Sequence, residues 1–136
     1  MRIVTSVFLM LLLMLPACAG KFDTGPGFEA FSKQFNEAMR WKDFPGAAGY
    51  LQGDVRGQFI DQFPEDDDLH IVESRIAGVE IDAEDGSVVA DYRLEYYRLP
   101  SMRVKKWQWA QRWEMYQPQG IKQSVWQIVN APPPLL

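Results

Sequence analysis

The chain has 136 residues, which is enough for one domain with a substantial core. Of these residues, 47% are hydrophobic and 24% are charged, a balance that is typical of a folded domain and argues against disorder. The formal net charge of −4 argues against nucleic acid as a partner, because nucleic-acid binding needs a basic face. It also argues against electrostatic docking of the whole chain on anionic lipid.

The first 17 residues predict an export signal that is not part of the fold. Arg2 supplies a short positive end, and the apolar run over residues 3–15 is too short for a transmembrane helix but suits a secretory signal. The run ends in Leu15-Pro16-Ala17-Cys18, which resembles a bacterial lipoprotein signal. In that family the segment before the cysteine is removed and the cysteine is acylated. The resemblance therefore implies lipidation at Cys18, which would anchor the mature chain in a membrane.

Cys18 is the only cysteine, so no intramolecular disulfide is expected. A free thiol is a liability in an oxidising compartment, and lipidation would remove it. The alternative is ordinary signal-peptidase cleavage after Ala17 or Ala19, which would leave a soluble protein. In the lipoprotein family an Asp after the cysteine marks retention at the inner membrane. Ala19 therefore implies attachment to the outer membrane, facing the periplasm of a Gram-negative host. Residues 18–27 are small, polar and glycine-rich, and predict a flexible lipidated tether.

Three helices are predicted before any strand. Apolar residues recur at helical spacing from Phe28 to Met39 and form one stripe towards a core. Asp43 is expected to cap a second, short helix that has Pro45 in its first turn. A third helix is expected to end before Pro64 and to direct four apolar side chains inward: Val55, Phe59, Ile60 and Phe63.

An acidic run and a first strand follow the helices. The run Glu65-Asp66-Asp67-Asp68 lacks the alternating ligands and central Gly of a calcium loop, so we interpret it as a solvated loop. The strand is expected over residues 69–82, with Val72, Ser74 and Ile76 on one face. Its apolar set then shifts to Val79 and Ile81. The apolar alternation changes face at Ala77-Gly78, and this change predicts a β-bulge.

Residues 87–116 predict a long hairpin of two alternating strands, joined at Leu99-Pro100-Ser101. Aromatic and β-branched residues favour strands here, and Pro100 belongs in the connection because it cannot donate to a ladder. A final strand is expected over residues 122–130, with Trp126 and Ile128 inward. Residues 132–136 are expected to form a loose tail.

This order of elements predicts an α+β fold, with N-terminal helices packed on a curved, antiparallel, four-stranded sheet. Over residues 28–130 the chain resembles the nuclear transport factor 2-like superfamily, a cone-shaped fold shared with polyketide-cyclase-like and ketosteroid-isomerase-like proteins. The resemblance rests on the helix order, the WKDFPGAAGYL segment, the long aromatic hairpin and the closing W-x-I at Trp126 and Ile128. A cystatin-like fold is the alternative, although three helical stretches count against its single helix. The domain is expected over residues 28–131.

The resemblance implies a pocket between the sheet and the helices, and alternation predicts the side chains that would line it. A ligand in this pocket would contact an aromatic set and one inward amide: Tyr92, Tyr96, Trp107, Gln111 and Trp113. The carboxylates of Asp91 and Glu95 fall on the opposite face, so neither is placed to act as a base. His70 is either a general base or, as we favour, a solvated histidine at a strand end.

Sequence motifs for chemistry are lacking. One His and one Cys do not make a metal site, and the chain has no phosphate-binding Gly loop, G-x-S-x-G or C-x-x-C motif. No metal or cofactor is therefore expected. Our first hypothesis is a membrane-anchored, non-catalytic binding or scaffold module. The alternative is a small-molecule-binding or isomerase/cyclase-like enzyme that uses the aromatic pocket.

Several partners follow from these hypotheses. The lipid anchor would bind the membrane, and a small hydrophobic ligand or a periplasmic protein would bind the domain. The resemblance also implies a homodimer, since relatives in that superfamily dimerise sheet to sheet; here the outer sheet face carries Arg93, Tyr97 and Arg112. The only basic patch contains Arg103, Lys105 and Lys106 near the hairpin connection, and we interpret it as solubilising first and partner-contacting second.

Overall fold

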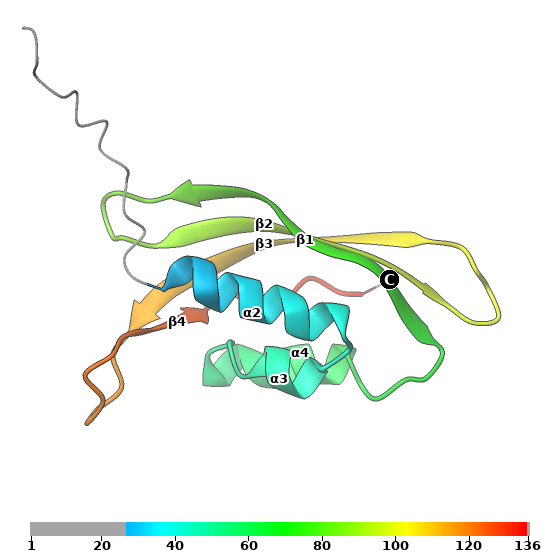
Figure 1. Cartoon of the computed structure of the whole chain (residues 1–136), viewed down its shortest axis with the longest axis horizontal. Coiled ribbons are helices and arrows are strands. Elements are labelled where there is room, and N and C mark those ends of the chain that lie inside the picture. The colour runs from blue at the N-terminus through cyan, green and yellow to red at the C-terminus, as the bar shows by residue number, and fades with distance from the viewer. Residues whose placement is uncertain (1–26, 136) are drawn as a thin grey trace, which may run out of the picture.

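The computed structural model describes residues 27–135, and within this range it shows an α+β fold (Figure 1). Three helices precede four strands: α2 (Phe28–Arg40), α3 (Phe44–Ala48), α4 (Gly53–Gln62), β1 (Leu69–Ile81), β2 (Val88–Arg98), β3 (Lys105–Tyr116) and β4 (Val125–Ile128). The strands form one open antiparallel sheet in the order β1-β2-β3-β4. The predicted fold class and order of elements are confirmed at this level.

The export signal, Cys18 and nearly all of the predicted tether lie outside the described residues. Only Gly27 of the tether is described, and it precedes α2 directly.

A side-chain cap marks the start of α3. The Asp43 carboxylate accepts the Gly46 N–H at 3.0 Å, so the predicted cap of α3 is confirmed. A Cβ at Gly46 would collide with that carboxylate, so the cap needs glycine there.

In α4, Phe59 is buried as predicted, but Ile60 is 47% exposed, so its predicted inward position is wrong. Ile60 follows Phe59 by one residue, which turns its side chain about 100° away from the buried face.

Two irregularities interrupt the pairing of β1 with β2. The pairing with β2 shifts between Ile76 and Gly78, which confirms the predicted bulge, and shifts again between Ile71 and Glu73. The second bulge leaves Val72 exposed, so its predicted place beside Ser74 is wrong. Each bulge inserts one residue and so restores the alternation after a slip.

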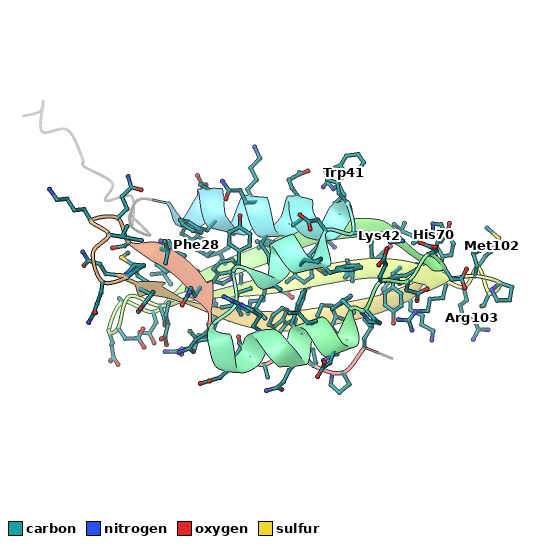
Figure 2. The ribbon with its side chains drawn as sticks, turned by 90° about the horizontal axis from the view of Figure 1, so that it is seen from below. Phe28, Trp41, Lys42, His70, Met102 and Arg103 are labelled. Atoms are coloured by element: carbon teal, nitrogen blue, oxygen red, sulfur yellow. The ribbon has the colours of Figure 1, made fainter. Side chains whose placement is uncertain are left out.

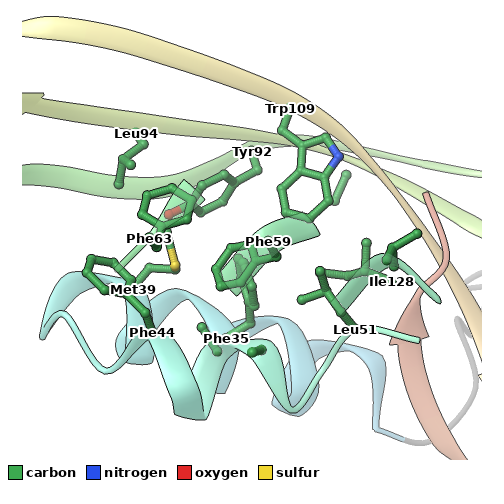
Figure 3. Packing of buried hydrophobic residues seen from close by; sticks show 14 of the residues in the cluster. Phe35, Met39, Phe44, Leu51, Phe59, Phe63, Tyr92, Leu94, Trp109 and Ile128 are labelled. Atoms are coloured by element: carbon green, nitrogen blue, oxygen red, sulfur yellow. The ribbon is translucent and has the colours of Figure 1, made fainter. Parts of the chain in front are cut away.

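The helices cover one face of the curved sheet, and the core between them is mostly aromatic (Figures 1 and 3). The ring of Phe35 on α2 lies 5.4 Å from that of Tyr92 and 6.1 Å from that of Trp113, both nearly perpendicular. Phe59 on α4 lies nearly parallel to Trp109 at 6.3 Å. Such pairs contribute about 0.5–1.5 kcal/mol each beyond the burial of their area.

The end of the chain differs from its prediction in two ways. β4 covers only Val125–Ile128 instead of residues 122–130; beyond it, the side chain of Asn130 accepts from the Arg112 N–H and donates to the Ala110 carbonyl in the middle of β3. The tail is not loose. Trp107 Nε1 donates to the Pro133 carbonyl at 3.2 Å, and the Leu135 N–H donates to Gln62 Oε1 at 2.8 Å. Proline cannot donate, but its carbonyl accepts, and its fixed φ lowers the entropic cost of ordering.

Gln62 holds the tail, since its amide also donates to the Pro132 carbonyl at 3.5 Å. We expect Gln62→Ala to lower the free energy of unfolding by about 1–2 kcal/mol, because it removes two hydrogen bonds that order the tail. Urea unfolding followed by tryptophan fluorescence measures this change. Gln58→Ala on the exposed side of α4 is the matched control, and an equal loss there would contradict the assignment.

Candidate functional site

The five predicted ligand-contacting side chains meet in the core, where each is at most 5% exposed. β2 supplies Tyr92 and Tyr96, and β3 supplies Trp107, Gln111 and Trp113. Phe35 and Phe59 pack into the space that these strands and the helices enclose (Figure 3). None of the five lines any of the surface hollows described below. A ligand at these residues stays a prediction, and it would require the core to open.

Some buried donors in this core lack an acceptor. Trp113 Nε1 donates to Gln111 Oε1 at 3.1 Å, which orients the amide. Gln111 Nε2, Trp109 Nε1 and Trp126 Nε1 have no hydrogen-bond partner within the described part of the chain. An unpartnered buried donor costs about 1–3 kcal/mol, so these groups are the polar exceptions in an apolar interior.

Tyr92 is held by a chain of hydrogen bonds that the sequence did not reveal. Ser74 Oγ lies 2.6 Å from Asn36 Oδ1 and 2.7 Å from the Tyr92 hydroxyl. Because the Ser74 proton goes to Asn36, Tyr92 donates to Ser74. Burial raises the pKa of Tyr92 far above its usual value of 10. Among residues 27–135, neither Tyr92 nor Ser74 is hydrogen-bonded to a carboxylate or imidazole that could take this proton, so the Tyr92 hydroxyl is suited to a structural hydrogen bond.

His70 lies apart from this core. Its ring stacks on Tyr97 at 4.9 Å and 12°, on the opposite face of the sheet. The same outer face carries the residues predicted for a homodimer. Arg93 pairs with Asp91 at 2.8 Å, and Arg112 pairs with Asp85 at 2.6 Å. The arginines of this face therefore have partners inside the chain already.

A protruding hairpin end forms a second candidate surface, which we call the arm (residues 98–106). Figure 1 shows β2 and β3 extending past the helices, and Figure 2 places Met102 and Arg103 at the end of the molecule opposite Phe28. Met102 is 72% exposed, and Leu99 and Val104 are also exposed. The arm has four cations and no carboxylate. The basic patch was predicted from the sequence, but the apolar side chains among its cations were not.

A hollow beside the base of the arm forms the third candidate surface, which we call the groove. It has a volume of about 510 Å³ and is lined by Lys42, Phe44, Pro45, Ile60, Phe63, Pro64, Glu65, Asp66 and Asp67. Arg98 pairs with Asp66 at 3.3 Å, and the Leu99 N–H donates to the Asp68 carbonyl. The acidic run, predicted as a solvated loop, is thus the wall of a hollow whose floor is apolar.

Lys42 helps to shape the groove. It has a left-handed backbone (φ 61°) directly after the Trp41 cap of α2, and its ammonium donates to the Asp66 carbonyl at 3.0 Å. A larger but shallower hollow of about 560 Å³ lies over α2 and α3 beside Trp41. Trp41 is 77% exposed and, with Lys42, lies at the arm end of the molecule (Figure 2).

Over residues 27–135, no three or more His, Cys, Asp or Glu side chains are grouped so as to hold a metal ion. In the same range, no helix has the length and apolar character needed to cross a membrane. Comparison with known proteins finds no family model, no curated protein and no solved structure that matches this chain.

The buried hydroxyl of Tyr92 predicts a loss of stability at alkaline pH. Above pH ~10 an unfolded tyrosine loses its proton while folded Tyr92 keeps it, so the unfolded state binds fewer protons and the free energy of unfolding falls. Tyr92→Phe should make this fall shallower between pH ~10 and ~12, as measured by urea unfolding at each pH.

The residual slope is assigned to Tyr50 and Tyr96, whose pKa values burial also raises. Tyr116→Phe is the matched control, because Tyr116 is exposed. A slope that is unchanged in Tyr92→Phe would contradict the assignment.

Proposed function

We propose that this chain is an exported lipoprotein, anchored through an acylated Cys18, whose domain binds or scaffolds other molecules without catalysis. We further propose that the domain is a cone-shaped module of the nuclear transport factor 2-like type. The observation that carries the non-catalytic assignment is that the interior of the domain is filled by its own aromatic side chains.

The arrangement of layers supports the cone assignment. Helices precede the strands and cover one face of a curved sheet, and β1 bends at two bulges (Figure 1). A long hairpin of 11 and 12 residues forms the middle of the sheet. These features match those from which the sequence resemblance was drawn.

The packing of the interior supports a binding role over an enzymatic one. An enzyme of the cone type would need space for a substrate between helices and sheet, and here Phe35, Phe59 and Trp109 occupy that space. The Tyr92 hydroxyl, which also reaches the interior, is bound by Ser74. Binding is therefore assigned to the surface, where the arm and the groove expose apolar and charged groups together.

In this proposal the first residue of the domain and the arm lie at opposite ends of the molecule (Figure 2). Phe28, which follows the tether, lies at one end of the molecule, and Met102 and Arg103 lie at the other (Figure 2). A chain held through Cys18 at the outer membrane would thus present the arm away from its point of attachment, to a periplasmic protein. The homodimer through the outer sheet face stays a prediction, with less support because Arg93 and Arg112 are paired within the chain.

The enzyme or small-ligand alternative has one observation in its favour. The free N–H groups of Gln111, Trp109 and Trp126 are donors that a carbonyl or oxyanion of a ligand would bind. This alternative requires the core to open far enough to admit that ligand.

Replacing the proposed lipidation residue tests the anchor. We expect Cys18→Ser to move the full-length protein from the membrane fraction to the soluble fraction of its bacterial host, because several acyl chains would be lost. Immunoblotting after a high-salt wash measures the distribution. Ala19→Ser keeps the cysteine and should stay with the membrane. Membrane association of Cys18→Ser that survives the wash would contradict the anchor.

Indole, a probe shaped like the tryptophan side chain, tests whether the interior is filled. Trp109→Ala should lose about 3–5 kcal/mol of stability and leave a cavity that binds indole, so indole should raise its unfolding temperature. The unfolding temperature of the wild type should not change. Trp41→Ala is the matched control, because Trp41 is exposed. An indole effect on the wild type would favour the ligand-binding alternative.

A further inference from the structure

The arm carries charges that its own chain does not neutralise. Arg98 pairs with Asp66 and Lys106 pairs with Glu95 at 3.7 Å, but Arg103 and Lys105 have no ion-pair partner among residues 27–135. Three apolar side chains lie among these cations, with Met102 the most exposed. An exposed apolar group ringed by cations is suited to a surface that is both apolar and acidic.

The groove has the complementary character. Its floor is formed by Phe44 and Phe63, with Ile60 exposed beside them. Its wall carries three carboxylates against one ammonium, that of Lys42. Asp66 is paired with Arg98, but Glu65 and Asp67 are exposed and have no ion-pair partner in the described range. Lys42 donates to a backbone carbonyl and has no ion-pair partner in that range either, so the unpaired charge of the groove is negative on balance, opposite in sign to that of the arm.

An arm does not fill the groove of its own chain. Arg98 and the Leu99 N–H hold the base of the arm against Asp66 and Asp68, and from there the hairpin runs outward past the helices (Figure 1). In Figure 2, Met102 and Arg103 lie farther out than Lys42, which lines the groove. The exposed tip of the arm is therefore free to enter a groove on another molecule.

We propose that two copies of this chain form a dimer by exchanging arms, each arm lying in the groove of the other copy. Arm and groove lie at the same end of the molecule, so one two-fold rotation forms both contacts at once and closes the assembly. Met102 packs against Ile60 and Phe63, while Arg103 and Lys105 pair with Glu65 and Asp67 of the second copy. This interface is distinct from the outer sheet face, and it does not depend on the lipid anchor.

Charge-reversal substitutions in the arm and in the groove, made separately and together, test the proposed exchange of arms. The full chain carrying Cys18→Ser is used, so that neither a lipid nor a native thiol contributes, and its mass in solution is measured by sedimentation velocity. We expect a dimer that dissociates at high salt. Arg103→Glu with Lys105→Glu should weaken the dimer at least about tenfold, and so should Glu65→Lys with Asp67→Lys. All four changes together should restore it, because opposite charges meet again.

Reversal of cations elsewhere is the matched control. Lys33→Glu with Lys122→Glu changes the net charge by the same amount as the arm variant, at exposed positions outside the arm and the groove. This control should leave the dimer unchanged. All four reversed residues of the arm and groove are exposed and unpaired, so the variants should fold, and circular dichroism verifies this.

A pair of cysteines tests the apolar contact separately. In the same Cys18→Ser chain, Met102→Cys and Ile60→Cys together should give a covalent dimer with a short bis-maleimide, whereas either change alone should not. A monomer at all concentrations would overturn the proposal. So would a dimer that persists in the arm variant alone and in the groove variant alone, which would indicate another face such as the outer sheet. Binding of the arm variants to phosphatidylglycerol vesicles more weakly than the wild type, without any dimer, would overturn it in favour of a lipid surface.

Discussion

The ring of Phe35 is the contact on which the rest of the domain depends. It is fully buried, and it lies against aromatic rings from α4, β2 and β3, including those of Phe59, Tyr92 and Trp113. A helix that spans a twisted sheet needs large side chains to fill the space under its middle turns, and aromatic rings fill it with few rotatable bonds. The same rings that stabilise the fold fill the space between the helices and the sheet.

Regular patterns in the sequence predicted the elements because those patterns have direct physical causes. Alternation fixed the inward face of the hairpin, and the slip at Ala77-Gly78 revealed a bulge. The second bulge, at Val72, was not predicted, because an apolar residue such as Val72 is compatible with either face of the sheet. Ile60 was predicted to face inward because the sequence does not distinguish an apolar residue beside the buried stripe of a helix from one within that stripe. The tail was predicted to be loose because the hydrogen bonds that order it are accepted by proline carbonyls. Backbone carbonyls leave no side-chain pattern in the sequence from which such bonds could be predicted.

The candidate sites were predicted less well, since they depend on residues that are distant in sequence. The five inward side chains were placed together correctly, but whether they leave a cavity depends on how α2 and α4 pack against them. Asn36 and Ser74 are 38 residues apart, so their contact with Tyr92 could not be foreseen. The basic patch and the acidic run were both visible in the sequence, but their proximity depends on contacts between distant residues, such as the ion pair of Arg98 with Asp66.

The bulges of β1 have a consequence for the solubility of the protein. β1 is an edge strand of 13 residues, and a flat edge of that length would present a continuous row of free N–H and C=O groups to any other extended chain. Two inserted residues interrupt that row and increase its twist, and Glu73, Arg75 and Glu80 add charge along it. The sheet is thereby protected against the edge-to-edge growth that leads to amyloid-like aggregation. Removing an inserted residue would straighten the strand at the expense of this protection.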